Sequence, residues 1–269
     1  MMNESQILET IKVIKEAIGV ELKGCEDISE DRKGVMFWFS NYTRGNGPVF
    51  SIRPSGIKRH VISLKFGPYA GACIEHINQN STEDSYALAY SFFKFLDEIC
   101  DVKINEHPPI DNWKIQKGFN VDLTIKVTNQ KSIEAINSSI KEVMVPLIAA
   151  LSEVIGYEDV VESIVGDEEG EVALILTRKR ERSKRNRLLC LSIHGETCGV
   201  CGLDPKLNYT GSTASIIEVH HIEPLSEVDK VKAYNPNTDL IPLCPNCHRA
   251  IHTRKPAYKP QELKALLIA

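Results

Sequence analysis

The 269-residue sequence has no apolar run near the roughly 20 residues that a membrane-spanning helix needs. Its first residues, MMNESQILET, lack the charged-then-apolar pattern of a secretory signal peptide. It contains no convincing internal repeat and no low-complexity tract. With 42% hydrophobic and 25% charged residues, its composition is that of an ordinary soluble protein. We therefore expect a cytoplasmic protein with a real core, folded as two domains or as one large domain with a small module.

Charge is unevenly divided along the chain. Residues 1–170 hold 17 Lys and Arg against 26 Asp and Glu, a net −9, whereas residues 171–269 hold 15 against 10, a net +5. Part of this excess lies in a predicted basic helix. A run of basic residues is typical of a solvated helix face or of a surface that neutralises nucleic-acid phosphates. The cluster of Cys and His residues that follows in the sequence, described below, favours the second interpretation. Its residues are Arg178, Lys179, Arg180, Arg182, Lys184, Arg185 and Arg187.

Hydrophobic spacing predicts an α+β fold for the N-terminal region. Isoleucines recur at helical spacing over residues 4–18, and Gly19 should end that helix. Three segments rich in aromatic and β-branched residues are separated by turn-forming residues, and we expect them to form an antiparallel meander. These segments are 34–42, 48–52 and 60–66.

More elements are expected downstream, in an order that also favours α+β. They are a helix at 82–100, a strand at 119–127, a helix at 131–156 and a strand at 171–176. Pro146 should kink the long helix. Pro108 and Pro109 make 106–112 the best candidate for a break, which leaves open a division of this region into two subdomains.

The N-terminal region carries no catalytic motif. Its aromatic residues could include a cage for an extruded base, although most aromatic residues in a strand belong to the core. The candidates are Phe37, Trp38, Phe39, Tyr42 and Tyr69, with Arg53, Lys58 and Arg59 as candidate phosphate contacts.

The eight cysteines are of two kinds. Four are isolated, whereas Cys198 with Cys201 and Cys244 with Cys247 form two Cys-x-x-Cys pairs. In a chain without an export signal this spacing favours metal over disulfide. Two such pairs can supply four thiolates to one tetrahedral Zn²⁺, a closed structural site that would stabilise a module with little core of its own.

Four of the eight histidines lie close to these cysteines. His248 and His252 are four residues apart in the predicted helix HRAIH, so both should project from one face. His220 and His221 are adjacent in the predicted strand IIEVHHI, so they should point to opposite sides. One of them can therefore bind metal while the other acts elsewhere. The alternative is that these are ordinary surface or core histidines.

Three segments, HGETCGVCG, IEVHHIEPLSE and NTDLIPLCPNCHRAIH, resemble the HNH nucleases of the ββα-metal superfamily. The resemblance is to the zinc-stapled branch that includes McrA-like, modified-cytosine-specific restriction endonucleases, and it extends from about Arg180 to the end of the sequence. It implies a small C-terminal ββα-metal module with a structural zinc.

The resemblance also implies roles for individual residues. His221 would be the general base that takes a proton from water. His220 and His248 would hold a divalent cation, with His252 as a further ligand or a phosphate contact. Glu218 would lie on the same strand face as His220 and orient a neighbouring ligand. Histidine sites accept Mg²⁺, Mn²⁺, Co²⁺ or Ni²⁺, so the identity of this cation stays open.

One position departs from the family pattern. The Asn that braces the loop of the general base usually stands just before the L-x-x-L-C run, where this sequence has Asp239, with Asn237 two residues earlier. An Asp can accept hydrogen bonds but cannot donate them as an amide does. Either Asp239 braces the loop by acceptance alone, or Asn237 takes over.

We expect an N-terminal recognition domain at 1–177 and an HNH nuclease domain, led by the basic helix, at 178–269. The favoured function is a metal-dependent DNA endonuclease, in particular a modification-dependent, McrA-like restriction enzyme of phage defence, that leaves 5′-phosphate and 3′-hydroxyl ends. The alternatives are an anti-phage HNH effector whose N-terminal domain binds a protein partner, and a non-catalytic zinc module that binds nucleic acid. The expected partner is DNA, modified or not; whether the chain forms a homodimer stays open.

Overall fold

The computed structural model describes residues 2–28, 32–156, 184–209, 216–222, 234–254 and 256–268. The chain divides into two compact units, Met1–Val160 and Val161–Ala269. The domain boundary expected between 177 and 178 and the strand expected at 171–176 lie outside the described residues. Among the described helices, none is long and apolar enough to span a membrane.

A six-stranded antiparallel sheet forms the centre of the N-terminal unit. Its strand order is β1-β2-β3-β4-β6-β5. The expected meander is confirmed as β2 to β4, and the strand expected at 119–127 is β6. The pattern did not reveal β1 or β5, which flank the sheet. The strands are β1 Leu22–Asp27, β2 Gly34–Phe39, β3 Pro48–Ser55, β4 Arg59–Phe66, β5 Asp101–Ile104 and β6 Asn120–Lys126.

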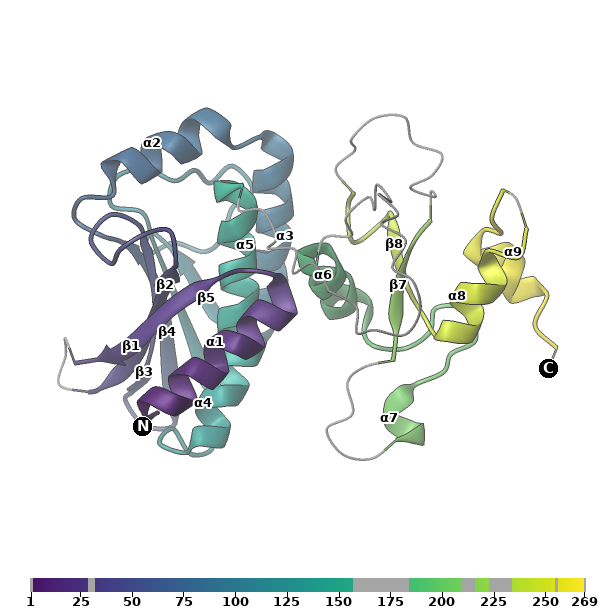
Figure 1. Ribbon diagram of the computed structural model, residues 1–269, viewed down its shortest axis with the longest axis horizontal. Helices are drawn as coiled ribbons and strands as arrows, with labels where there is room; N and C mark the ends of the chain where they lie inside the picture. Colours follow the sequence, from purple (N-terminus) through teal and green to yellow (C-terminus); the bar gives the residue numbers. More distant parts are fainter. Residues whose placement is uncertain are drawn as a thin grey trace, which may run out of the picture. The chain divides into compact units, whose positions relative to one another are not determined.

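Helices cover one face of this sheet. Figure 1 shows α1, α3, α4 and α5 on that side, and among the described residues no helix of this unit lies over the other face. α1 begins with a capping box between Asn3 and Gln6 and ends at Gly19, whose φ of 72° is left-handed. The helices are α1 Glu4–Ile18, α2 Gly71–Asn80, α3 Glu83–Ile99, α4 Ile133–Ser139 and α5 Val145–Ile155.

The long helix expected at 131–156 is interrupted as its proline requires. A π-helical turn, η1 Ile140–Met144, joins α4 to α5 immediately before Pro146. In this turn the Val145 N–H bonds to the carbonyl of Ile140, five residues back. Proline lacks an N–H and crowds the carbonyl four residues before it, so a wider turn relieves the conflict.

Residues 106–112 form a connection inside this sheet. The strands on either side of them, β5 and β6, pair with each other, and β6 also pairs with β4. A division into two subdomains at this loop therefore has no support in the sheet.

The strand alternation decides which aromatic residues are buried. Phe37, Phe39 and Phe50 are 0% exposed on the helix-covered face. Phe37 and Phe39 are therefore core residues, and their proposed part in an aromatic cage was wrong. Trp38 points to the opposite face and is half-buried.

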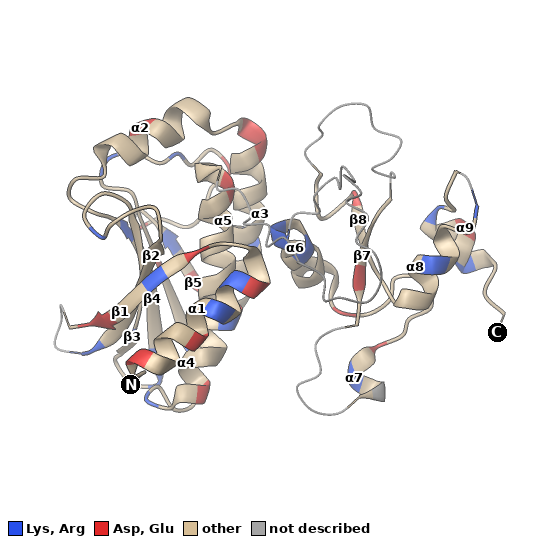
Figure 2. Ribbon diagram, in the orientation of Figure 1, with Lys and Arg blue, Asp and Glu red and all other residues tan. Residues whose placement is uncertain are grey.

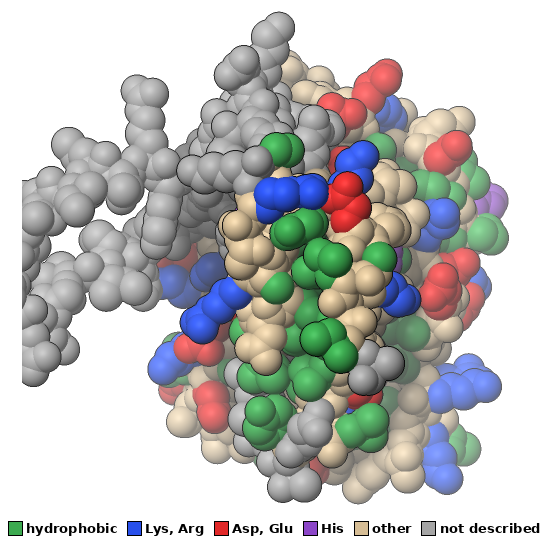
Figure 3. Space-filling model, turned by 90° about the vertical axis from the view of Figure 1, so that its right-hand side faces the viewer, with side chains coloured by type: hydrophobic (Ala, Val, Ile, Leu, Met, Phe, Trp, Pro, Cys, Tyr) green, Lys and Arg blue, Asp and Glu red, His purple; other side chains and the backbone are tan. Residues whose placement is uncertain are grey.

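The C-terminal unit is built around a hairpin and a helix. β7 Glu218–His221 pairs antiparallel with β8 Leu240–Leu243, and α8 Pro245–Ile251 follows directly. The other helices described in this unit are α6 Lys184–His194, α7 Pro205–Asn208 and α9 Pro260–Ala265. Figure 3 shows hydrophobic side chains gathered on the side where α9 lies. Leu266 and Leu267, which follow α9, are among the exposed hydrophobic residues.

Candidate functional site

Two turns bring the four paired cysteines together. Cys198 and Cys201 belong to a knuckle closed by the Gly202 N–H, which donates to the Cys198 carbonyl at 2.9 Å, and Gly202 has a left-handed φ of 74°. The Gly199 N–H donates to the Pro242 carbonyl at 2.9 Å and so ties this knuckle to β8. Cys244 caps α8, where its Sγ accepts from the Cys247 N–H at 3.5 Å.

The sulfur positions fit one tetrahedral zinc ion. All four Sγ atoms lie within 4.8 Å of one another, and Cys201 Sγ is 3.7 Å from Cys244 Sγ. Tetrahedral Zn–S bonds of about 2.3 Å place the sulfurs roughly 3.8 Å apart. Three of the cysteines are buried and Cys201 is exposed. The cluster can therefore hold zinc in a closed structural site, as the sequence spacing predicts.

The thiols have different proton affinities when no cation is bound. Burial raises the pKa of Cys198, but backbone hydrogen bonds at Cys201, Cys244 and Val200 outweigh burial and lower it to about 7. Burial and the neighbouring thiols raise the pKa of Cys247. One thiol thus ionises readily, whereas further thiolates beside it need a cation to balance their charge.

Three histidines form a second cluster. His220 on β7 is 3% exposed, and His248 on α8 and His252 at its end lie one helical turn apart. One ring nitrogen from each lies within 4.8 Å of the others, and the ring centroids are 4.9–5.3 Å apart. Imidazoles this close repel one another if charged, but together they offer neutral nitrogen ligands to a divalent cation.

Glu218 orients one of these rings. Its Oε2 pairs with Nδ1 of His248, across the contact of β7 with α8. Nε2 of His248 is buried and has no hydrogen-bond partner among the described residues. A carboxylate on one ring nitrogen with the other nitrogen left open is the usual arrangement of a metal-binding histidine.

His221 lies apart from this cluster, as the alternation of a strand requires. It is half-buried, and its ring meets that of Tyr234 edge to face, with centroids 4.7 Å apart. Tyr234 was not identified from the sequence, because no local pattern connects it with His221. A histidine next in sequence to a cluster residue but outside the ligand set can still exchange a proton with water.

A tight loop supports the position of His221. The Asp239 carboxylate accepts from the Asn235 N–H and the Thr238 hydroxyl, each at 3.0 Å. The Asp239 carbonyl accepts from the Ile222 N–H at 2.9 Å, directly after His221. Asn237 is exposed, and its N–H donates to the Asn235 side chain at 2.9 Å. In this geometry Asp239 braces the loop by acceptance.

Replacing Asp239 by alanine removes the acceptor of two hydrogen bonds. We expect the free energy of unfolding of the C-terminal unit to fall by about 1–2 kcal/mol. Asp239→Asn keeps one acceptor oxygen and should lose about half as much. Thermal unfolding measures both variants, and unchanged melting temperatures would show that the carboxylate does not hold the loop.

The basic residues predicted to contact DNA differ in their surroundings on α6, the part of this run that the structure describes. Figure 2 shows Lys and Arg residues on α6. Lys184 is exposed, but Arg185 is only 8% exposed and a guanidinium nitrogen of Arg187 donates to the Ile217 carbonyl at 2.8 Å. Arg187 thus fixes the chain that enters β7, and Arg185 is turned away from solvent. Arg178, Lys179, Arg180 and Arg182 lie outside the described residues.

One contact to the loop before β8 also escaped the sequence pattern. Nε2 of His194, at the end of α6, lies 3.1 Å from the Pro236 carbonyl. The two residues are 42 positions apart, so only the fold brings them together.

A two-stranded hairpin, a helix, four clustered cysteines and three clustered histidines define a small ββα domain with two groups of side chains that could each hold a metal ion. Residues 198–254 match the family model of the HNH endonucleases. The chain therefore carries a C-terminal HNH domain, which supports a metal-dependent nuclease. No curated protein and no solved structure matches the chain.

Proposed function

We propose that this protein is a metal-dependent DNA endonuclease. The observation that carries the proposal is the histidine arrangement: one ring nitrogen from each of His220, His248 and His252 lies within 4.8 Å of the others, and His221 follows His220 on β7, outside that set. The HNH match over residues 198–254 supports the same reaction class.

The four histidines would have two different roles in this reaction. His221 takes a proton from the attacking water, a role suited to an imidazole that titrates near neutral pH. His220, His248 and His252 would hold the divalent cation, Mg²⁺ or Mn²⁺ (or Co²⁺ or Ni²⁺). When bound, this cation supplies positive charge against the scissile phosphate and the leaving oxygen. The cysteine cluster would bind Zn²⁺ and so hold the hairpin and α8 together.

The test is cleavage of a supercoiled plasmid by the full chain with each of these four cations. We expect nicked or linear products with 5′-phosphate ends that a DNA ligase rejoins. A plasmid left intact with all four cations in its unmodified, cytosine-methylated and phosphorothioated forms alike would overturn the proposal and favour a zinc module that only binds nucleic acid.

Glu218 gives a prediction on metal binding. Glu218→Gln keeps the size of the side chain but removes the charge that faces Nδ1 of His248. We expect the Mn²⁺ concentration for half-maximal cleavage to rise about 10- to 100-fold. The maximal rate at saturating Mn²⁺ should change much less. Glu196→Gln, elsewhere in the same unit, is the control, and an equal shift in both variants would contradict the orienting role.

For biological use, we propose a cytoplasmic, modification-dependent restriction enzyme of phage defence, resembling the McrA-like branch. Its support is the layout, in which the HNH domain is joined to a separate N-terminal unit. The test is digestion of one plasmid prepared unmodified, cytosine-methylated and phosphorothioated. Equal rates would refute this use and favour the anti-phage effector whose N-terminal unit binds a protein partner.

A further inference from the structure

The uncovered face of the N-terminal sheet is unusually rich in positive charge for a unit that is acidic in sum. Side chains of paired residues point to the same face, so the strand register assigns each residue to one side. Six cations belong to the face opposite the helices, against three carboxylates, Asp27, Asp101 and Asp122. The cations are Lys23, Arg53, Arg59, Lys65, Lys103 and Lys126.

One cross-strand row on this face combines an aromatic ring with two lysines. The register aligns Lys23 with Trp38, Trp38 with Val49, and Val49 with Lys65. Lys23 and Lys65 are exposed, whereas Trp38 is half-buried. Because neighbouring strands are about 4.8 Å apart, the two lysines stand roughly 14 Å apart with the indole between them.

Arg44 adds a third cation to this row. From the loop between β2 and β3 it reaches back over the sheet, and its guanidinium carbon lies 5.6 Å from the centre of the Trp38 ring. Its hydrogen-bond acceptors are two sulfur atoms, Cys25 Sγ at 3.8 Å and Met36 Sδ at 3.7 Å. Sulfur is a weak acceptor, so a phosphate oxygen would displace it at little cost.

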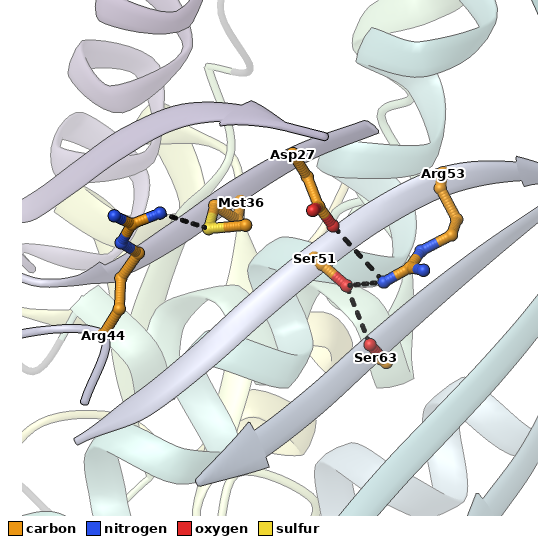
Figure 4. Close-up of polar contacts among 6 residues, drawn as sticks. All are labelled: Asp27, Met36, Arg44, Ser51, Arg53 and Ser63. Carbon is orange, nitrogen blue, oxygen red and sulfur yellow. Dashed lines mark hydrogen bonds and ion pairs between the residues drawn. The ribbon is translucent and has the colours of Figure 1, made fainter. Parts of the chain in front are cut away.

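Arg53, farther along the face, is held differently. Arg53 pairs with the buried carboxylate of Asp27 at 3.3 Å and bonds to Ser51, which in turn bonds to Ser63. Figure 4 shows this network beside Arg44, whose drawn contact is to Met36. Arg53 was a candidate phosphate contact, but here a carboxylate already neutralises it.

Among the described residues, Lys23, Arg44 and Lys65 have no carboxylate within ion-pair distance, whereas Lys103 lies 4.0 Å from Asp101. Arg59 and Lys126, opposite each other at the other end of the face, also lack one in the described part of the chain, so the aromatic ring among the cations is what distinguishes the end that carries Trp38. We call Lys23, Trp38, Arg44 and Lys65 the tryptophan row.

We propose that the tryptophan row binds a single strand of DNA, with an unpaired base stacked on Trp38 and phosphates on Lys23, Arg44 and Lys65. Uncovered sheets that carry aromatic residues are a recurrent platform for such strands, because every base offers a flat face and the strand can lie across the sheet. In a duplex the bases already stack on one another and cannot reach a side chain on a broad sheet. This inference rests on the proposed DNA substrate and adds that the N-terminal unit binds an unpaired segment of it.

The test uses the full chain with His221→Ala, so that bound DNA is not cut, without added divalent cations. Fluorescence anisotropy measures binding to a labelled oligothymidine of about 20 nucleotides and to the duplex of the same length. We expect Trp38→Leu to weaken single-strand binding about tenfold and Trp38→Phe to retain most of it. Arg44→Gln and Lys65→Gln should each reduce the salt dependence by about 0.7 in the log–log slope. Lys12→Gln and Lys94→Gln, exposed on helices of the same unit, are the controls and should bind as the parent does.

Equal single-strand affinity in the parent, Trp38→Leu and Arg44→Gln would overturn the inference, as would an equal loss in Lys12→Gln. A loss shared by Trp38→Phe and Trp38→Leu would remove the stacking role. Plasmid cleavage by the wild-type chain is scored separately. The two proposals can therefore be refuted independently: single-strand binding by the tryptophan row can be absent while the plasmid is cut, or present while it is not.

Discussion

Replacing His221 by alanine is expected to slow DNA cleavage about 10²- to 10⁴-fold, the range that a positioned general base contributes. His221 lies outside the cluster of His220, His248 and His252, so its loss leaves the proposed cation ligands in place. DNA binding and the Mn²⁺ concentration for half-maximal cleavage should therefore stay near their wild-type values. Single-turnover cleavage at saturating Mn²⁺, with binding measured by anisotropy, checks both expectations.

Two other histidines make the comparison specific. His76→Ala, on the exposed side of α2 in the N-terminal unit, removes an imidazole that does not belong to the HNH domain and should cleave at the wild-type rate. His220→Ala removes a proposed ligand and should raise the Mn²⁺ requirement as well as slow the reaction. Wild-type cleavage by His221→Ala would assign the base to another group, and loss of binding with cleavage would indicate a structural role for His221.

The sequence predicts best where the governing interactions are local. Helix α1 follows from isoleucines at helical spacing and from Gly19, and the meander follows from strand-forming runs between turns. β1 was missed because its sequence, LKGCED, has little apolar alternation. α2 was missed because only two of its side chains, Cys73 and Ile77, are buried. In both segments tertiary packing, more than intrinsic pattern, decides the structure.

The same distinction holds at the site. The metal ligands were found because Cys-x-x-Cys turns and a His pair four residues apart are set by local backbone geometry. Tyr234 and His194 were not found, because each reaches the site from a part of the chain with no such spacing. A run of basic residues also does not show which way each side chain points. The sequence therefore assigned the same role to Lys184, which is exposed, to Arg185, which is buried, and to Arg187, which bonds to a backbone carbonyl.

Replacing Cys247 by serine is expected to have the largest effect on stability. The hydrophobic core cluster described in the C-terminal unit holds twelve buried residues, and three of them, Cys198, Cys244 and Cys247, are cysteines of the four-cysteine group. A core this small rarely supplies more than a few kcal/mol alone, whereas structural zinc contributes about 10–16 kcal/mol of apparent binding free energy to folding. With one thiolate gone, three ligands and a hydroxyl should bind zinc far more weakly, and the unit should lose its cooperative fold.

The measurement combines zinc content per chain with thermal unfolding and limited proteolysis. We expect Cys247→Ser to lose its zinc and become protease-sensitive after α5, while the transition of the N-terminal unit stays in place. A strong zinc chelator should produce the same change in the wild-type chain. Cys25→Ser is the matched control, because Cys25 lies in the N-terminal sheet, outside both clusters. If Cys247→Ser lost its zinc yet melted as the wild type does, the hydrophobic core alone would hold the hairpin against α8, and the histidine site would not depend on the cysteines. If it kept one zinc per chain, Cys247 would not be a required ligand.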